Sequence, residues 1–219
     1  MDIREEIKVH DEAVRRDDLR CGVVICGRCH GSPGEFRLHE RRRRTFWVVV
    51  ARLVEKMLTF LLRWKCPLCG GTFTEYPAFA LRHKRYVSQE VFGRSGRYVQ
   101  EDARTYEDAV QDRNMPVFHE GDFGKEGCRC LSAVTVWRWV GFTSGLKETF
   151  RKVLRMIRGK CSRCDLSRRV YPVPAWKYRS EVRRKVLEQC KRLFDAEAIY
   201  RRLFGVSNFP HFGIAGSSE

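Results

Sequence analysis

The sequence lacks a long uninterrupted apolar run. Residues 1–18 are charged throughout and contain no apolar segment of the kind that a secretory signal needs. In the most apolar stretch, residues 45–62, the centre is occupied by Arg52, Glu55 and Lys56, which a membrane span could hardly tolerate. We therefore expect a cytoplasmic protein that has no membrane as its partner.

Signatures of catalysis are missing as well. The sequence has no glycine-rich phosphate loop, no nucleophile with a base at a recognisable spacing, and no set of carboxylates spaced to hold two metal ions. The acidic residues between positions 102 and 122 fall in stretches expected to be helix and loop, where a solvated role is common. Internal repeats and low-complexity tracts are also absent. We expect no enzymatic activity.

Acidic residues are scarce relative to basic ones. The chain has 43 Lys and Arg but only 27 Asp and Glu, which gives a formal net charge of +16. This excess predicts an acidic partner, and nucleic acid is the first candidate. The alternatives are an anionic membrane surface and a charge that serves only solubility. The hydrophobic (43%) and aromatic (12%) contents are typical of an ordered globular protein.

Cysteine is abundant, and much of it occurs in CxxC pairs. In a cytoplasmic chain this pattern favours metal binding over disulfides. Cys26 with Cys29 and Cys66 with Cys69 can supply the four thiolates of a closed tetrahedral zinc site, which would hold the fold and leave no position for catalysis. Ordinary buried thiols or a redox pair are the alternatives. His30 could replace one cysteine, although a surface histidine is the simpler interpretation.

Two further pairs, a CxC and a CxxC, together contain the four cysteines that a second zinc site would need. Alternatively, these are core or surface thiols, with one pair or neither bound to metal. Cys21 and Cys190 have no spaced partner and are expected in the core. The candidate ligands of the second site are Cys128, Cys130, Cys161 and Cys164.

Apolar periodicity and turn signals predict an α+β fold, with a small zinc-ribbon β domain followed by a helix-turn-helix and basic helices. Strands are expected at 20–25, 45–54, 56–65 and 73–77, and helices at 88–100, 105–112, 132–142, 146–159 and 180–204. A loop is expected at 113–129. The expected segments are an N-terminal arm or short helix (1–20), the zinc ribbon (21–80), the helix-turn-helix (81–145), a basic helical region (146–204) and a loose tail (205–219).

The helix that opens at Ser132 has the form of a recognition helix. Val136 and Trp139 are placed for the core, and a helix of this kind can enter the major groove of DNA. The long loop before it departs from the short turn of the simplest motif. An ordinary amphipathic helix is the alternative. The residues expected to face DNA are Ser132, Thr135, Trp137 and Arg138.

Most of the positive charge lies in residues 146–204, which contain 18 Lys and Arg against six Asp and Glu. Phosphate contacts should concentrate there. A solvated helix face is the alternative, although such a face would normally interleave more acidic residues. A smaller basic run, residues 41–44, lies beside an aromatic pair. The predicted phosphate-binding residues are Arg151, Lys152, Arg155, Arg158, Arg183, Arg184 and Lys185.

Two stretches carry a family resemblance: CPLCGGTFTEYPAFALRHKRYVSQEVF (66–92) and SAVTVWRWVGFTSGL (132–146). They resemble bacterial zinc-ribbon proteins of unassigned function that are often encoded in or near mobile elements. In that family a CxxC ribbon is followed by a Pro-aromatic-Lys-Arg-Tyr turn and a transposase-like helix-turn-helix. The resemblance implies a bacterial, nucleoid-associated protein that binds double-stranded DNA in transposition or its regulation. The Cys128/Cys130 pair has no counterpart in the family.

The sequence thus predicts a zinc-stabilised DNA-binding protein without catalytic activity. The alternative is a protein-interaction adaptor that recruits a transposase or another mobile-element protein through its ribbon and basic helices. A third interpretation is a fragment of an enzyme whose catalytic domain is missing.

Overall fold

The structure is a computed structural model that describes residues 2–100, 103–111, 129–164, 166, 169–207 and 209. Within these residues it contains six α-helices, one short 3-10 helix and a three-stranded sheet, so the predicted α+β class is confirmed. The chain forms two compact units. Unit 1 holds the described residues up to Val48 together with Glu55–Gln89, and unit 2 holds Val49–Val54 together with the described residues from Glu90 to Phe209.

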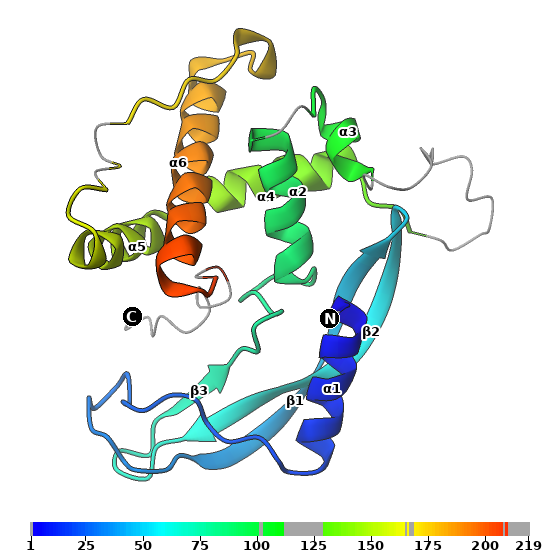
Figure 1. Cartoon of the computed structure of the whole chain (residues 1–219). Coiled ribbons are helices and arrows are strands. Elements are labelled where there is room, and N and C mark those ends of the chain that lie inside the picture. The colour runs from blue at the N-terminus through cyan, green and yellow to red at the C-terminus, as the bar shows by residue number, and fades with distance from the viewer. Residues whose placement is uncertain are drawn as a thin grey trace. The chain divides into compact units, whose positions relative to one another are not determined.

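Unit 1 is built on a long β-hairpin (Figure 1). Strands β1 (Arg37–Val50) and β2 (Leu53–Lys65) form the hairpin, and β3 (Thr72–Glu75) pairs antiparallel with the end of β2. The strand predicted at 56–65 lies within β2, but the predicted strand at 45–54 contains the turn at residues 51–52, so it covers the end of β1 and the start of β2. However, β1 begins earlier than expected, because the basic run that precedes its apolar half continues the same strand.

Helix α1 (Ile3–Arg15) covers part of the hairpin in unit 1. The carboxylate of Asp2 caps the helix by accepting from the backbone N–H of Arg4, so the charged N-terminal segment folds as the short helix. His10 contacts β2 through its Nε2 atom, 3.0 Å from the carbonyl oxygen of Phe60. The core beside the helix consists of Val14, Cys26, Phe36, Leu62, Trp64 and Cys66.

The expected strand at 20–25 is wrong, because this segment is irregular. Its backbone groups bond to side chains instead of a neighbouring strand. The N–H of Gly22 donates to Glu75 Oε1 at 3.0 Å, and the carbonyl of Val24 accepts from the Ser32 hydroxyl at 3.2 Å. Val24 is 71% exposed, so its β-branched side chain does not mark a buried strand here.

Unit 2 is helical, and the five helices predicted for it are present: α2 (Ser88–Gln100), α3 (Tyr106–Val110), α4 (Ala133–Ser144), α5 (Lys147–Lys160) and α6 (Glu181–Phe204). The short 3-10 helix η2 (Ala175–Lys177) was not predicted. Thr105 and Asp108 form a reciprocal capping box at α3, and Ser132 and Ser180 cap α4 and α6. Helix α6 contacts both α4 and α5. None of the described helices has the length and apolar content to cross a membrane.

The tip of the hairpin belongs to unit 2. Ala51 and Arg52 both have positive φ angles, 46° and 70°, as a tight two-residue hairpin turn requires. The buried guanidinium of Arg52 lies 2.6 Å from a carboxylate oxygen of Glu107, and its carbonyl accepts from the N–H of Leu131 at 2.9 Å. The N–H of Val54 donates to the carbonyl of residue 129 at 2.8 Å. Unit 2 therefore holds this turn by backbone pairing and by an ion pair.

Candidate metal centre and basic surface

Two cysteine turns in unit 1 share one backbone pattern. In each, the N–H of the first cysteine donates to the carbonyl five residues later, at 2.9 Å in the first turn and 2.8 Å in the second. The N–H four residues later donates back to the cysteine carbonyl, at 2.9 Å in both. These bonds fold each CxxC into a knuckle that directs two sulfurs the same way. The knuckles are Cys26–Gly31 and Cys66–Gly71.

The residue four positions after the first cysteine takes a left-handed conformation in both knuckles. It is His30 in the first, with φ of 56°, and Gly70 in the second, with φ of 70°. The side chain of His30 is exposed, and His30 is not part of the sulfur group described next. The surface interpretation of this histidine is therefore correct.

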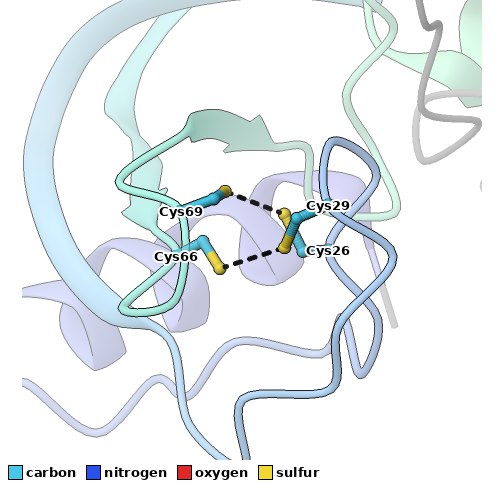
Figure 2. A group of neighbouring side chains, drawn as sticks. All are labelled: Cys26, Cys29, Cys66 and Cys69. Carbon is cyan, nitrogen blue, oxygen red and sulfur yellow. Dashed lines mark hydrogen bonds between the residues drawn. The ribbon is translucent and has the colours of Figure 1, made fainter.

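The four predicted sulfurs come together, as Figure 2 shows. All lie within 4.8 Å of one another, with Cys26 Sγ 3.8 Å from Cys69 Sγ and Cys29 Sγ 3.9 Å from Cys66 Sγ. A tetrahedral centre with metal–sulfur bonds of about 2.3 Å needs sulfur–sulfur distances of about 3.8 Å. The group could therefore hold a metal ion without moving its sulfurs far.

Backbone hydrogen bonds favour the thiolate form at Cys26, whereas burial and hydrogen bonds to the neighbouring cysteines raise the pKa of the Cys29 thiol to about 11. Cys26 and Cys66 are buried, whereas Cys29 and Cys69 face solvent. Hydrogen bonds from the backbone N–H groups of Cys29 and Arg28 lower the pKa of the Cys26 thiol to about 6. Metal ligation requires the deprotonated sulfur, so the same bonds support it.

The knuckles also interlock through their last glycines. A Cβ on Gly71 would lie 2.9 Å from the Arg28 side chain and 3.2 Å from Cys69 Sγ. A Cβ on Gly31 would lie 2.7 Å from the end of the Leu68 side chain. Each glycine thus lets one knuckle approach the third residue of the other, which brings the four sulfurs into reach.

The predicted second metal site is not assembled among the described residues. In that part of the chain, the four knuckle cysteines form the one group with three or more candidate metal ligands. Cys161 Sγ and Cys164 Sγ lie 2.7 Å apart in the turn that follows α5. Cys130 lies elsewhere in unit 2, bridged to Leu53 at the hairpin tip. Cys128 is outside the described residues.

The two remaining cysteines lie where the sequence predicted, in or against the core. Cys21 is half-buried, and burial raises the pKa of its thiol to about 11. Cys190 is buried, and burial raises the pKa of its thiol to about 12. Its sulfur lies 3.2 Å from the carbonyl oxygen of Val140. Neither cysteine belongs to the four-sulfur group.

Helix α4 has the division of faces that was predicted for it. Val136 and Trp139 are buried, whereas Arg138 is exposed and Trp137 is 49% exposed. The hydroxyl of Ser132 accepts from the N–H of Thr135 at 3.4 Å and lies 3.0 Å from its hydroxyl, so both polar side chains act in the helix cap. Much of the segment between α3 and α4 lies outside the described residues, and the helix-turn-helix stays a prediction.

Helix α5 presents a basic face. Its buried side is formed by Val153 and Ile157, and the helix has one acidic residue, Glu148, which pairs with Arg151. Neither Lys152 nor Arg155 has an acidic partner among the described residues. All four basic residues predicted for this helix are exposed: Arg151, Lys152, Arg155 and Arg158.

The three basic residues predicted on α6 have three different surroundings. Arg184 pairs with both Glu181 and Glu188 of its own helix. Arg183 is half-buried, and its Nε donates to the Tyr106 hydroxyl at 3.0 Å. Lys185 is exposed. One of the three therefore keeps the solvated position that phosphate contact needs.

Arg183 belongs to a chain of aromatic rings and cations that spans unit 2. The rings of Tyr98 and Tyr106 stack with centroids 3.8 Å apart, and Arg183 lies over Tyr106 and Trp137 at 5.3 and 5.2 Å. At the other end, the Nζ atom of Lys177 is 5.2 Å from the Tyr98 ring and 5.2 Å from the exposed Trp176 ring. The sequence did not indicate this array, because its members come from α2, α3, α4, α6 and η2.

The smaller basic run on β1 is largely engaged within unit 1. Arg41 pairs with Asp17, Arg42 pairs with Glu40, and Arg44 donates to the carbonyl of residue 84 at 2.7 Å. The run therefore offers less free charge than its composition suggested.

No protein-family model, curated protein or solved structure matches this chain. The resemblance to mobile-element zinc-ribbon proteins stays a prediction from the sequence.

Proposed function

We propose that this chain is a zinc-stabilised protein that binds double-stranded DNA through unit 2 and has no catalytic activity of its own. The observation that carries the proposal is the exposed basic face of α5, which one acidic residue accompanies. DNA presents a dense row of phosphates, and cationic side chains that lack acidic partners gain most from neutralising them. The helix also packs against α6 through a shared apolar core.

Zinc is the metal that the four-cysteine group suits best. Structural zinc sites use four thiolates in a tetrahedron, and the sulfur–sulfur distances of 3.8 and 3.9 Å agree with that geometry. A closed shell of four protein ligands leaves no position for water or substrate. The zinc would stabilise unit 1, while unit 2 would carry the binding function.

Helix α4 would add sequence preference to the binding. Arg138 is exposed, and arginine can form two hydrogen bonds with guanine in the major groove. Trp137 beside it offers an apolar surface to base methyl groups or sugars. We expect Arg138→Ala to relax sequence preference while leaving most of the nonspecific affinity in place.

The salt dependence of affinity tests the DNA proposal. If Lys152 and Arg155, the two predicted cations of α5 that have no acidic partner among the described residues, each contact a phosphate, log K should fall with log salt at a slope of about −1.8, which is about 12-fold between 50 and 200 mM salt. Arg155→Gln should reduce that slope by about 1. Arg184→Gln is the matched control, since the charge of Arg184 is already paired with two glutamates, and we expect it to leave the slope unchanged. A flat salt series would refute the proposal.

An adaptor function is the second candidate, favoured by large apolar side chains at the surface of unit 2. These are Val134, Trp137, Trp176 and Val182, all about half exposed or more. They could bind a protein partner such as a transposase. Pull-down of that partner in the presence of excess unrelated DNA separates the two functions, because an adaptor would keep its partner.

The process served is a separate proposal that rests on the sequence resemblance. Under it, the DNA bound most tightly should be a mobile-element end. Selection of bound fragments from a genomic library tests this, and enrichment of unrelated promoters or of no sequence would contradict it.

A further inference from the structure

The turn after α5 brings two cysteines unusually close. Cys161 ends the helix, its N–H donating to the carbonyl of Ile157 at 2.7 Å, and the N–H of Cys164 donates back to the carbonyl of Cys161 at 3.2 Å. These backbone bonds fix both residues in one turn. Their sulfurs lie 2.7 Å apart.

That separation distinguishes this pair from the metal centre, although both use the CxxC spacing. Sulfurs that share a tetrahedral metal stand about 3.8 Å apart, whereas a disulfide bond is about 2.05 Å long. The distance of 2.7 Å lies nearer the bonded value. In addition, no third His, Cys, Asp or Glu joins the pair to form a ligand group in the described part of the chain.

We propose that Cys161 and Cys164 form a reversible disulfide, so that the turn is a thiol-oxidation site. The oxidant class is a low-molecular-weight disulfide. One cysteine thiolate attacks a sulfur of the oxidant, forms a mixed disulfide and releases one thiol. The second thiolate then attacks the protein-bound sulfur of the mixed disulfide, which closes the Cys161–Cys164 bond and releases the second thiol. Two cysteine protons are lost and the oxidant is reduced to two thiols.

The surroundings suit this chemistry. Both side chains are half-buried, so a small oxidant can reach them while bulk solvent access is limited. Basic residues flank the pair at Lys160 and Arg163, both exposed, and positive charge near a thiol favours the reactive thiolate. Cys164 packs against the core formed by α5 and α6, which restrains it in place.

Mass spectrometry of the metal-loaded full chain tests the proposal in glutathione buffers of increasing oxidised fraction. Trypsin cleaves after Arg163, between the two cysteines, so unmodified chain yields separate peptides 161–163 and 164–168. After oxidation, alkylation and digestion without reductant, we expect these peptides as one disulfide-linked species, with two fewer alkylated thiols per chain. Dithiothreitol should restore the separate peptides.

Single variants sharpen the result. In Cys161→Ser and Cys164→Ser, the mixed disulfide cannot be resolved, so we expect a stable glutathione adduct on the remaining cysteine. The buried Cys190 should stay alkylatable only after unfolding in every sample, which controls for general oxidation. Full alkylation of both peptides across the buffer series would overturn the proposal. So would a second equivalent of zinc in the purified chain that Cys161→Ser abolishes.

Discussion

If the four-cysteine group of unit 1 holds zinc as proposed, removal of the metal should unfold the knuckles of unit 1 and leave the helices of unit 2 folded. Structural zinc contributes about 10–16 kcal/mol in small sites, which matches or exceeds the total stability of about 5–15 kcal/mol of a typical domain. Cys26 and Cys66 are also part of the unit 1 core, so four uncompensated thiolates or thiols would disturb its packing. Unit 2 contains no part of this sulfur group.

Amide hydrogen exchange measures the effect at defined positions. The informative amides are the four that close the knuckles, those of Cys26, His30, Cys66 and Gly70. If chelation removes even about 4 kcal/mol of local stability, their exchange should accelerate about 10³-fold, because each 1.4 kcal/mol is a factor of ten. Amides in the middle of α6 serve as the internal reference and should change little. Equal rates with and without chelator would refute the metal assignment.

A pair of variants separates ligand loss from general damage to unit 1. Cys69→Ser removes an exposed ligand, and we expect the purified chain to lose its metal. Cys21→Ser changes a half-buried cysteine outside the group, and we expect one equivalent of metal to be retained.

Two further predictions concern close packing. Gly71→Ala should weaken metal affinity by about tenfold, because its Cβ would press on a ligand sulfur, while Gly31→Ala should cost less, since the exposed end of a leucine can move aside. Chelator competition measures both, and equal losses would contradict the interlocked geometry. In unit 2, Tyr106→Phe should lower the free energy of unfolding by about 1 kcal/mol, because it removes the hydroxyl that accepts from Arg183. Arg183→Ala should lower it by about 2 kcal/mol, because this change also removes the cation–aromatic contacts with Tyr106 and Trp137. Urea denaturation distinguishes them, and equal effects would assign no stabilising role to the ring contacts.

Local signals predicted much of the fold. The caps at Thr105, Ser132 and Ser180 each begin a helix where the sequence placed one, because a side-chain oxygen there accepts from a free backbone N–H. The four knuckle cysteines were predicted for a similar reason. Each CxxC turn is closed by hydrogen bonds within its own six residues, so its geometry is local. Only the approach of one turn to the other depends on the β1–β2 hairpin that connects them.

Features that depend on distant partners could not be predicted. The segment at 20–25 reads as a strand by composition, yet its partners are side chains of Ser32 and Glu75. At the hairpin tip, Arg52 would be expected at the surface from its charge alone. It is buried because its guanidinium pairs with Glu107. Periodicity within one element carries no information on such contacts.

The distribution of positive charge shows the same limit most clearly on α6. The sequence assigned phosphate binding equally to three neighbouring residues of α6. In the structure Arg183 lies between two aromatic rings, and Arg184 is paired with two carboxylates. Lys185 alone is exposed without an acidic partner among the described residues. Ion pairs within a helix reduce the charge available to DNA, because displacing a carboxylate offsets the gain from a phosphate. On α5, Lys152 and Arg155 are both exposed without an acidic partner among the described residues. If unit 2 binds DNA as proposed, the basic face of α5, more than that of α6, should therefore set the affinity.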